Sequence, residues 1–176
     1  EFVAYMVAHL KGSALVLCNL KAKQGDALYA RIKALSGQRP VYYVTGDMEG
    51  ADRETIRQSA DADEDAIIVA TYGVFQLGVN IKRLRHIVFA VAGKSKVRTL
   101  QSIGRGLRLH ASKSKVTIFD LVDDLRIGRH TNYSWRHAEL RTALYAREQF
   151  EVSMHPVSLE RFTLLKNKST EHADFS

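Results

Sequence analysis

Short continuous apolar runs alternate along the chain with longer segments whose apolar residues recur at helical spacing. The apolar runs are Ala14–Cys18, Pro40–Val44, Ala66–Ala70, His86–Val91 and Val116–Leu121. Helical patterns cover Phe2–Leu10, Ala22–Leu35, a segment that Asp52 can cap and that runs to about Ala60, and Leu100–Leu107. Uninterrupted runs of this length are typical of parallel strands buried on both faces. The pattern therefore predicts an α/β fold, a parallel sheet sandwiched between helices, with ligands at the carboxyl ends of the strands.

The pattern changes after Asp124. Residues 126–132 are typical of a loop, and Asn132 or Ser134 can cap a helix from about Trp135 to Gln149. Phe150–Met154 then alternates like a strand. We therefore predict a main domain over residues 1–125, a small helix-and-strand appendage over 126–165 that packs on it, and a frayed polar tail over 166–176.

Composition narrows the class of protein. A hydrophobic fraction of 45% in 176 residues supports one packed domain with an appendage. The one cysteine, Cys18, lies inside an apolar run, so we expect a small buried residue. The seven histidines show no ligand spacing, and we assign no metal site. No stretch approaches the roughly 20 apolar residues of a membrane span, and no signal pattern opens the chain, so we expect a cytoplasmic protein without a membrane partner. Because the chain begins without Met, we also expect a fragment.

The net charge of +7 is unevenly spread. Acidic residues concentrate between Asp47 and Asp65, and basic residues dominate from Lys82 to Arg129. A basic half on a soluble domain favours a polyanion partner, nucleic acid first. A solvated basic surface without a ligand explains the charge alone equally well.

The octet Gln101–Arg108 carries the strongest chemical signal. Arg105 and Arg108 are three residues apart, so on a helix they share a face. Guanidinium groups stay charged and donate several fixed hydrogen bonds, which suits them to a transferred phosphate. Gly104 and Gly106 let a backbone or a phosphate approach closely. Taken alone, the two arginines also fit a basic helix end that satisfies its own carbonyls.

The order of several short sequence motifs along the chain favours the phosphate-binding interpretation over a basic helix end. Gln101–Arg108 resembles motif VI of superfamily 2 helicases, Ile68–Thr71 with Gly78–Asn80 resembles motif V, Leu15–Cys18 resembles motif IV, and Gly46 with Arg53 resembles the segment between motifs IV and V. Further tracts resemble the recombination-helicase branch of that superfamily: Ala70–Phe75, Lys94–Lys96, Phe119–Asp124 and Tyr145–Phe150. The resemblance implies the second RecA-like domain of an ATP-dependent nucleic-acid helicase.

The resemblance also implies a role for each matching residue. Arg105 and Arg108 would reach into a cleft between two RecA-like domains and stabilise the γ-phosphate of ATP, with Arg108 as the arginine finger. Gln101 would link the nucleotide state to the domain interface. Gly78, Asn80 and Gly104 would lie close to the nucleotide, although Asn80 stands where many members have Asp. The residues that would contact the nucleic-acid backbone are Thr71, Lys94, Ser95 and Lys96.

The phosphate-binding loop of an ATPase is missing from the sequence. Gly93-Lys94-Ser95 has the ending of such a loop, but the required Gly at position 88 is Val88. We therefore expect ATP with Mg²⁺ to be held mainly by a preceding RecA-like domain of the same protein, and the isolated chain to be inactive. The expected partner is DNA, with RNA as the alternative. Alternatives are a non-catalytic nucleic-acid-binding module, a restriction-type duplex translocase or an RNA helicase.

Two further groups of residues have alternative interpretations. One group is the three carboxylates Asp120, Asp123 and Asp124. A helicase Walker B motif would come before motif VI, whereas these residues follow it. We therefore expect capping and salt bridges with the surrounding arginines rather than a metal site. Trp135 and Tyr145 are candidates for stacking on bases. Aromatic residues on an amphipathic helix more often belong to the core, and we favour that interpretation.

Overall fold

The structure, a computed structural model, describes residues 1–19, 24–76, 84–90, 115–126, 130–158, 160 and 162–163. Its elements follow one another as α1 (Phe2–His9), β1 (Ala14–Cys18), α2 (Asp26–Leu35), β2 (Val41–Val44), α3 (Gly50–Ala62), β3 (Ile67–Thr71), α4 (Tyr72–Gln76), β4 (His86–Phe89), β5 (Thr117–Asp120) and α6 (Tyr133–Arg147). The strands form a five-stranded sheet in the order β2-β3-β1-β4-β5, and every neighbouring pair is parallel. The predicted parallel sheet is confirmed. The predicted helix over Leu100–Leu107 lies outside the described residues.

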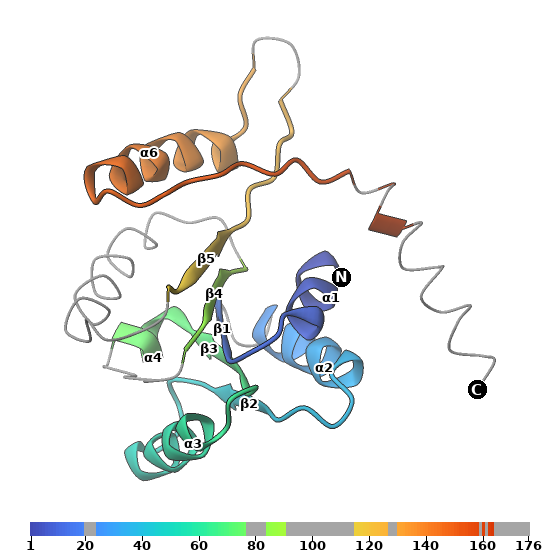
Figure 1. Cartoon of the computed structure of the whole chain (residues 1–176), viewed down its shortest axis with the longest axis vertical. Helices are drawn as coiled ribbons and strands as arrows, with labels where there is room; N and C mark the ends of the chain where they lie inside the picture. Colours follow the sequence, from blue (N-terminus) through green and yellow to red (C-terminus); the bar gives the residue numbers. More distant parts are fainter. Residues whose placement is uncertain are drawn as a thin grey trace.

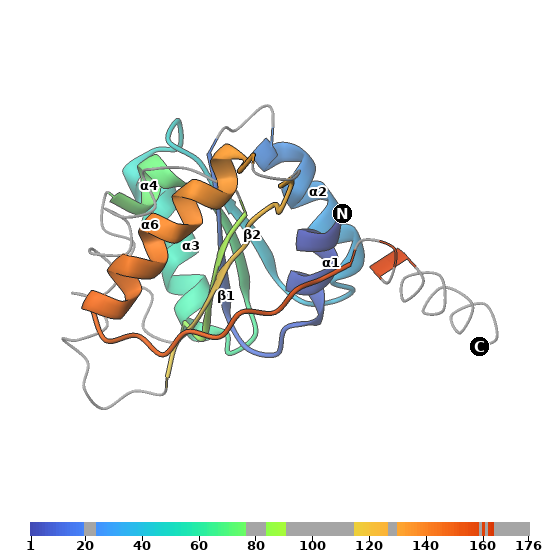
Figure 2. The same ribbon diagram turned by 90° about the horizontal axis from the view of Figure 1, so that it is seen from above.

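Helices cover both faces of the sheet (Figures 1 and 2). On one face, α1 and α2 pack through Ala4, Val7 and Ile32 against strand residues such as Val16 and Val88. On the other face, α3, α4 and α6 enclose a second cluster that includes Leu17, Ile87 and Phe89. The central strand β1 is buried along all five of its residues. This double coverage explains why its sequence is a continuous apolar run.

Helix α3 begins earlier than the sequence suggested. Glu49 occupies its N-cap position without a side-chain capping bond, and Asp52 lies in the first turn. The prediction that Asp52 caps this helix is therefore wrong. A carboxylate in the first turn still stabilises the helix, because it faces the positive end of the helix dipole.

The C-terminal helix α6 ends in a Schellman motif. Phe150 N–H donates to Tyr145 O over 2.9 Å, and Gln149 N–H donates to Ala146 O over 3.1 Å. Gln149 has a φ of 58°, the left-handed conformation that this motif requires. The rings of Tyr145 and Phe150 stack at 6.1 Å, which adds the apolar contact common at such ends. The end of α6 is thus set by local geometry and by packing together.

The chain beyond α6 forms no strand over residues 150–158, so the strand predicted for Phe150–Met154 is wrong. Its alternating apolar side chains are exposed, with Val152 at 50% and Met154 at 72%. A strand needs a neighbouring edge to pair with, and alternation by itself does not supply one. The segment instead runs back across the molecule towards α1 (Figure 2). There Phe162 packs edge-on against Phe2 and Tyr5, at 5.3 and 5.5 Å between ring centroids.

Candidate functional site at the carboxyl edge of the sheet

The carboxyl ends of all five strands lie at one edge of the sheet, because all pairs are parallel. The register aligns one row of residues across the sheet just inside this edge: Val44, Ala70, Leu17, Phe89 and Asp120. Thr71 of β3 pairs with Cys18 of β1 one residue further out. This edge is where an α/β sheet of this kind places its ligands, and we take it as the candidate site.

Thr71 is the residue of the predicted site that the structure describes. It is the last residue of β3, it is half-buried, and the chain passes directly from it into the short helix α4. Its contact with a nucleic-acid backbone stays a prediction. The other site residues lie outside the described residues: Gly78, Asn80, Lys94, Ser95, Lys96, Gln101, Gly104, Arg105 and Arg108.

The loop after β2 is closed by its own side chains. Thr45 is buried, and its hydroxyl donates a short hydrogen bond to the Asp47 carboxylate. Met48 N–H donates to Thr45 O over 3.3 Å. Gly46 lies inside this turn, and α3 with Arg53 follows it. The tract that resembles the segment between motifs IV and V is thus a tight turn at the candidate edge.

The end of β1 is packed against the start of α2. The Cys18 thiol is buried and donates to Ala70 O over 3.5 Å. Burial raises the pKa of this thiol, against the opposing effect of a backbone hydrogen bond, and the nearby charge of Asp26 adds to the rise. The thiol is therefore protonated at neutral pH. The prediction of a small buried residue at Cys18 is confirmed.

The contact between the start of α2 and β2 explains why residue 25 is a glycine. Tyr43 donates to Asp26 Oδ1 over 2.9 Å and stacks on Tyr29 at 5.1 Å. Burial and the bond to Asp26 raise the pKa of Tyr43. A Cβ at Gly25 would collide with the Tyr43 hydroxyl, so glycine is needed for the close approach of α2 to β2.

A buried polar cluster joins β5 to α6. Arg141 is 1% exposed, and it donates from Nε to Asp120 Oδ2 over 2.6 Å and from Nη2 to Asp120 Oδ1 over 3.1 Å. Tyr145 donates from its hydroxyl to Asp120 Oδ2 over 2.7 Å. Burial, followed by the charge of Asp120, raises the pKa of Tyr145. The predicted salt bridge at Asp120 is confirmed, and so is the core position that we favoured for Tyr145.

Sequence reasoning missed Arg141 as a member of this cluster. The signal was an arginine on the same helical face as Leu144 and Tyr145, since residues three and four apart share a face. A charged residue on the apolar face of a helix requires a buried partner. The partner, Asp120, is 21 residues away in the sequence, and only the fold identifies it.

Trp135 is stacked against protein rather than standing free. The guanidinium of Arg126 lies 3.6 Å from the centre of the Trp135 ring, and the indole N–H donates to Glu139 over 3.1 Å. Arg126 also forms two hydrogen bonds to Asp124, at 2.7 and 2.6 Å, which lower the pKa of that carboxyl. The predicted salt bridge at Asp124 is confirmed. Base stacking on Trp135 was the alternative that we did not favour, and it would have to use the face that Arg126 leaves open.

The loop between β5 and α6 is braced at its base. Asn132 occupies the N-cap position of α6 without a capping bond from its side chain. Its side-chain amide instead donates to Asp123 O over 2.8 Å, and its oxygen accepts from Leu125 N–H at 3.4 Å. Ser134 accepts from Asp123 N–H at 3.3 Å. Asn132 and Ser134, the predicted caps, therefore hold the loop instead, and Asp123 is bonded through its backbone.

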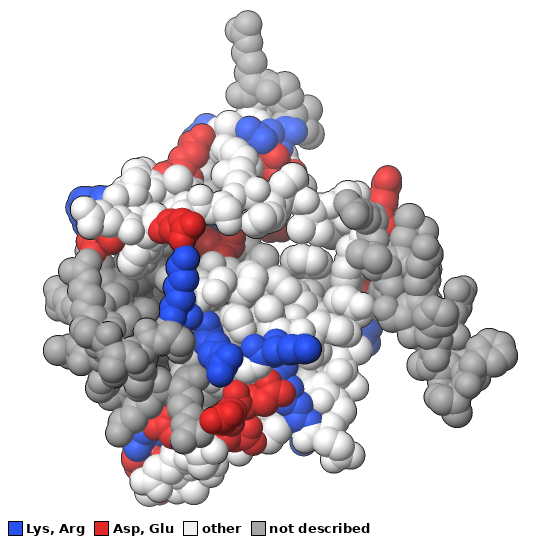
Figure 3. All heavy atoms as spheres, in the orientation of Figure 1, with Lys and Arg blue, Asp and Glu red and all other residues white. Residues whose placement is uncertain are grey.

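Charge in the described part is mixed. Figure 3 shows Lys and Arg side chains on one face of the molecule with Asp and Glu close to them. One such neighbour pair is Lys115 and Glu151, at 2.5 Å. The predicted basic half runs from Lys82 to Arg129, and most of its Lys and Arg residues lie outside the described residues. Within the described ranges, no helix is long and apolar enough to cross a membrane, and no group of three or more His, Cys, Asp or Glu side chains is placed to hold a metal.

Comparison with known proteins adds the family. Residues 1–110 match the model of the helicase conserved C-terminal domain. This chain belongs to that family. It is 37% identical over 145 residues to the ATP-dependent DNA helicase UvsW of enterobacteria phage T4, and this match covers 77% of the chain and 28% of the phage protein. The chain therefore spans less than a third of the length of this relative.

Solved structures agree with the family. The crystal structure of T4 UvsW superposes with a TM-score of 0.73 at 34% identity, over 89% of this chain and 33% of that one. Domain 2 of the DEAD-box helicase Mss116p, solved with an RNA duplex, gives a TM-score of 0.57 at 16% identity, over 90% of this chain and 57% of that one. The second likeness shows the fold alone. The predicted RecA-like fold and the resemblance to superfamily 2 helicases are confirmed, and the similarity extends to the T4 helicase UvsW.

Proposed function

We propose that this chain is the second motor domain of an ATP-dependent DNA helicase or translocase that remodels branched DNA in recombination and repair. The observation that carries the proposal is the 37% identity to the phage T4 DNA helicase over most of the chain. In the full-length protein, ATP binds between this domain and a preceding RecA-like domain. Arg105 and Arg108 stabilise the γ-phosphate, and Gln101 with Gly78, Asn80 and Gly104 lines the domain interface.

The topology supports this arrangement. The described chain leaves the sheet at Ala90, at the carboxyl end of β4, and returns at Lys115, before the amino end of β5. The intervening sequence holds both the Lys94–Lys96 tract and the octet. Thr71 lies at the same carboxyl edge from which this connection starts, which supports a nucleic-acid contact there.

The Mg²⁺ ion of the nucleotide fits the preceding domain better than this one. Three carboxylates near the described carboxyl edge already have partners: Asp26 accepts from Tyr43, Asp47 from Thr45 and Asp120 from Arg141. Arginine, glutamine and asparagine side chains on this domain suit the phosphates and the interface instead. When bound, ATP supplies the free energy for movement along the strand, and this chain stabilises the charge that develops on its phosphates.

The test is DNA-stimulated ATP hydrolysis by the full-length protein. Arg108→Ala is expected to lower the stimulated kcat by about 10³-fold or more, because an arginine finger contributes about 10³–10⁵ in rate. Arg31→Ala, a change at a half-exposed surface pair with Glu1, is the control and leaves the rate unchanged. Wild-type hydrolysis in the Arg108→Ala protein would refute the finger assignment. Strand-displacement and branch-migration assays then distinguish a helicase from a duplex translocase.

A further inference from the structure

On the side of the sheet that α6 covers, two buried polar atoms have no hydrogen-bond partner within the described part of the chain. One is Nη1 of Arg141, the guanidinium nitrogen that does not contact Asp120. The other is the hydroxyl oxygen of Tyr72, a residue that is 6% exposed. A buried polar group without a partner is costly, and each such group in a folded protein calls for an explanation. Here the two atoms are complementary, because a guanidinium N–H donates and a phenolic oxygen accepts.

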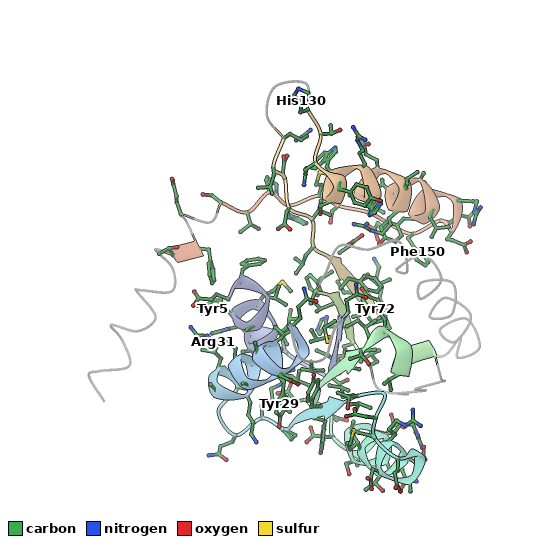
Figure 4. All side chains as sticks on the ribbon, turned by 180° about the vertical axis from the view of Figure 1, so that it is seen from behind. Tyr5, Tyr29, Arg31, Tyr72, His130 and Phe150 are labelled. Carbon is green, nitrogen blue, oxygen red and sulfur yellow. The ribbon has the colours of Figure 1, made fainter. Side chains whose placement is uncertain are left out.

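The two groups already lie in one electrostatic environment. Burial raises the pKa of Tyr72 first, the charge of Asp120 raises it further, and the charge of Arg141 opposes that rise. The Tyr72 ring stacks on Phe89 at 6.1 Å, and Phe89 is the in-register neighbour of Asp120. Figure 4 shows Tyr72 on the side of the sheet that faces α6, the side on which Phe150 also lies. The Tyr72 hydroxyl and the Arg141 guanidinium thus lie on the same side of the sheet and both interact with the charge of Asp120.

Tyr72 is also joined directly to the candidate nucleic-acid contact. It follows Thr71 in the chain and is the first residue of α4, a helix of five residues. Because Thr71 and Tyr72 are consecutive, a nucleic-acid backbone that shifts Thr71 also shifts Tyr72. Arg141, in contrast, is held rigidly by its two bonds to Asp120. The geometry thus pairs one fixed donor on α6 with one acceptor on a segment that a ligand can move.

We propose that Arg141 is a positioning residue for the motor: its Nη1 donates a hydrogen bond to the Tyr72 hydroxyl oxygen when nucleic acid binds at Thr71. Helix α6 then stabilises the bound conformation of the Thr71–Gln76 segment. A contact that is made only in the bound state shifts the equilibrium towards that state. The inference rests on the proposed function, since it assigns Thr71 to a nucleic-acid backbone, and it gives α6 a role in coupling binding to hydrolysis.

The decisive variant is Tyr72→Phe, which removes the hydroxyl and keeps the ring against Phe89. In the full-length protein we expect the concentration of single-stranded DNA for half-maximal ATPase stimulation to rise about five-fold, the change that loss of one hydrogen bond of about 1 kcal/mol gives. In the free chain, the same change leaves the melting temperature unchanged or raises it. Tyr42→Phe is the matched control, because Tyr42 packs against the same core cluster and is expected to alter neither quantity.

A second variant, Arg141→Lys, keeps the positive charge beside Asp120 and removes Nη1. If Arg141 and Tyr72 act as a pair, Tyr72→Phe adds no further rise in the half-stimulating concentration in the Arg141→Lys background. Additive effects would overturn the proposal, as would a Tyr72→Phe protein with wild-type stimulation. A Tyr72→Phe chain that is less stable without nucleic acid would show that the hydroxyl is already bonded in the free state, and would overturn it too. Absence of DNA-stimulated hydrolysis in the wild-type protein is a different outcome, and it refutes the proposed function together with the inference.

Discussion

Arg39 is expected to be among the most important single side chains for the stability of this domain. Its side chain is 8% exposed, and it gathers the end of α1 and the turn before β3. The three shortest bonds run from Nη1 to Leu10 O at 2.6 Å, from Nη2 to Gly12 O at 2.6 Å and from Nε to Asp65 O at 2.5 Å. Nη2 also forms an ion pair with Asp65 Oδ1 at 3.1 Å. The residue therefore satisfies carbonyls that the end of a helix leaves without partners.

The magnitude of its contribution follows from these contacts. Hydrogen bonds to a charged group contribute about 1.5–3 kcal/mol each, so three give about 4–9 kcal/mol. Against this stands the desolvation of the guanidinium, several kcal/mol for a buried ion, and burial is also the main cause of its lowered pKa. Leu10 and Gly12 are half-buried and Asp65 is exposed, so water reaches their carbonyls when Arg39 is removed. We expect Arg39→Met to lower the free energy of unfolding by about 2–3 kcal/mol.

Urea unfolding followed by circular dichroism measures this quantity, provided that the slope of the transition stays constant. Arg39→Lys keeps the charge but loses the fork, and we expect a loss of about 1–2 kcal/mol. Arg31→Met is the control, since the Arg31–Glu1 pair is 49% and 61% exposed and such surface pairs contribute about 0–1 kcal/mol. A loss below about 1 kcal/mol for Arg39→Met, or no difference between the Arg39 and Arg31 variants, would refute the reasoning.

Two further predictions concern α6. Gln149→Gly is expected to stabilise the chain by about 0.5–1 kcal/mol, because a left-handed residue with a side chain costs about 1–2 kcal/mol and glycine loses about 0.5–1 kcal/mol of that gain to the entropy of the unfolded chain. Gln58→Gly on the exposed face of α3 should cost about 1 kcal/mol in the same urea unfolding measurement, and equal effects of the two changes would contradict the first prediction. Tyr145 has a pKa raised above that of the unfolded chain, so its contribution is fully present below about pH 10 and is lost as pH rises further. Between pH 10 and 11.5, the free energy of unfolding of the wild-type chain should therefore fall more steeply than that of Tyr145→Phe, by about 1.4 kcal/mol per pH unit. Tyr133→Phe, at an exposed position, is the control. Parallel curves for the wild type and Tyr145→Phe would show that Tyr145 does not titrate differently on folding.

The strands were predictable because they lie between two layers of helices. β1 and β3 are buried at nearly every position, so their sequences contain uninterrupted apolar residues that stand out from the surrounding polar segments. The ends were less accurate: His86–Val91 was predicted, and β4 is His86–Phe89. Pairing with β1 ends at Phe89, where Leu17 is the last partner, and the apolar pattern contains no information on where pairing stops.

Other features were not predictable from local pattern. α4 is too short to show a helical period, and it exists because β3 ends at Thr71 beside a core that Tyr72 and Val74 fill. The alternation of Phe150–Met154 predicts a strand in any context that offers an edge, and the described segment pairs with none. The site residues of motif VI were found by resemblance alone. Their positions lie outside the described residues, and their roles stay predictions.

The layered α/β fold and the family could be predicted from the chain alone, because both depend on the order of apolar runs and motifs. Which polar groups meet could be learned only from the folded molecule. Asp120 faces Arg141 across 21 residues, and Arg39 reaches Gly12 across 27 and Asp65 across 26. The partner of a buried charge is a group that the packing of distant segments brings within hydrogen-bond distance. The local sequence around the charge does not indicate which group that is. The hydrogen bond proposed between Arg141 and Tyr72 is of this kind, since the two residues are far apart in the sequence.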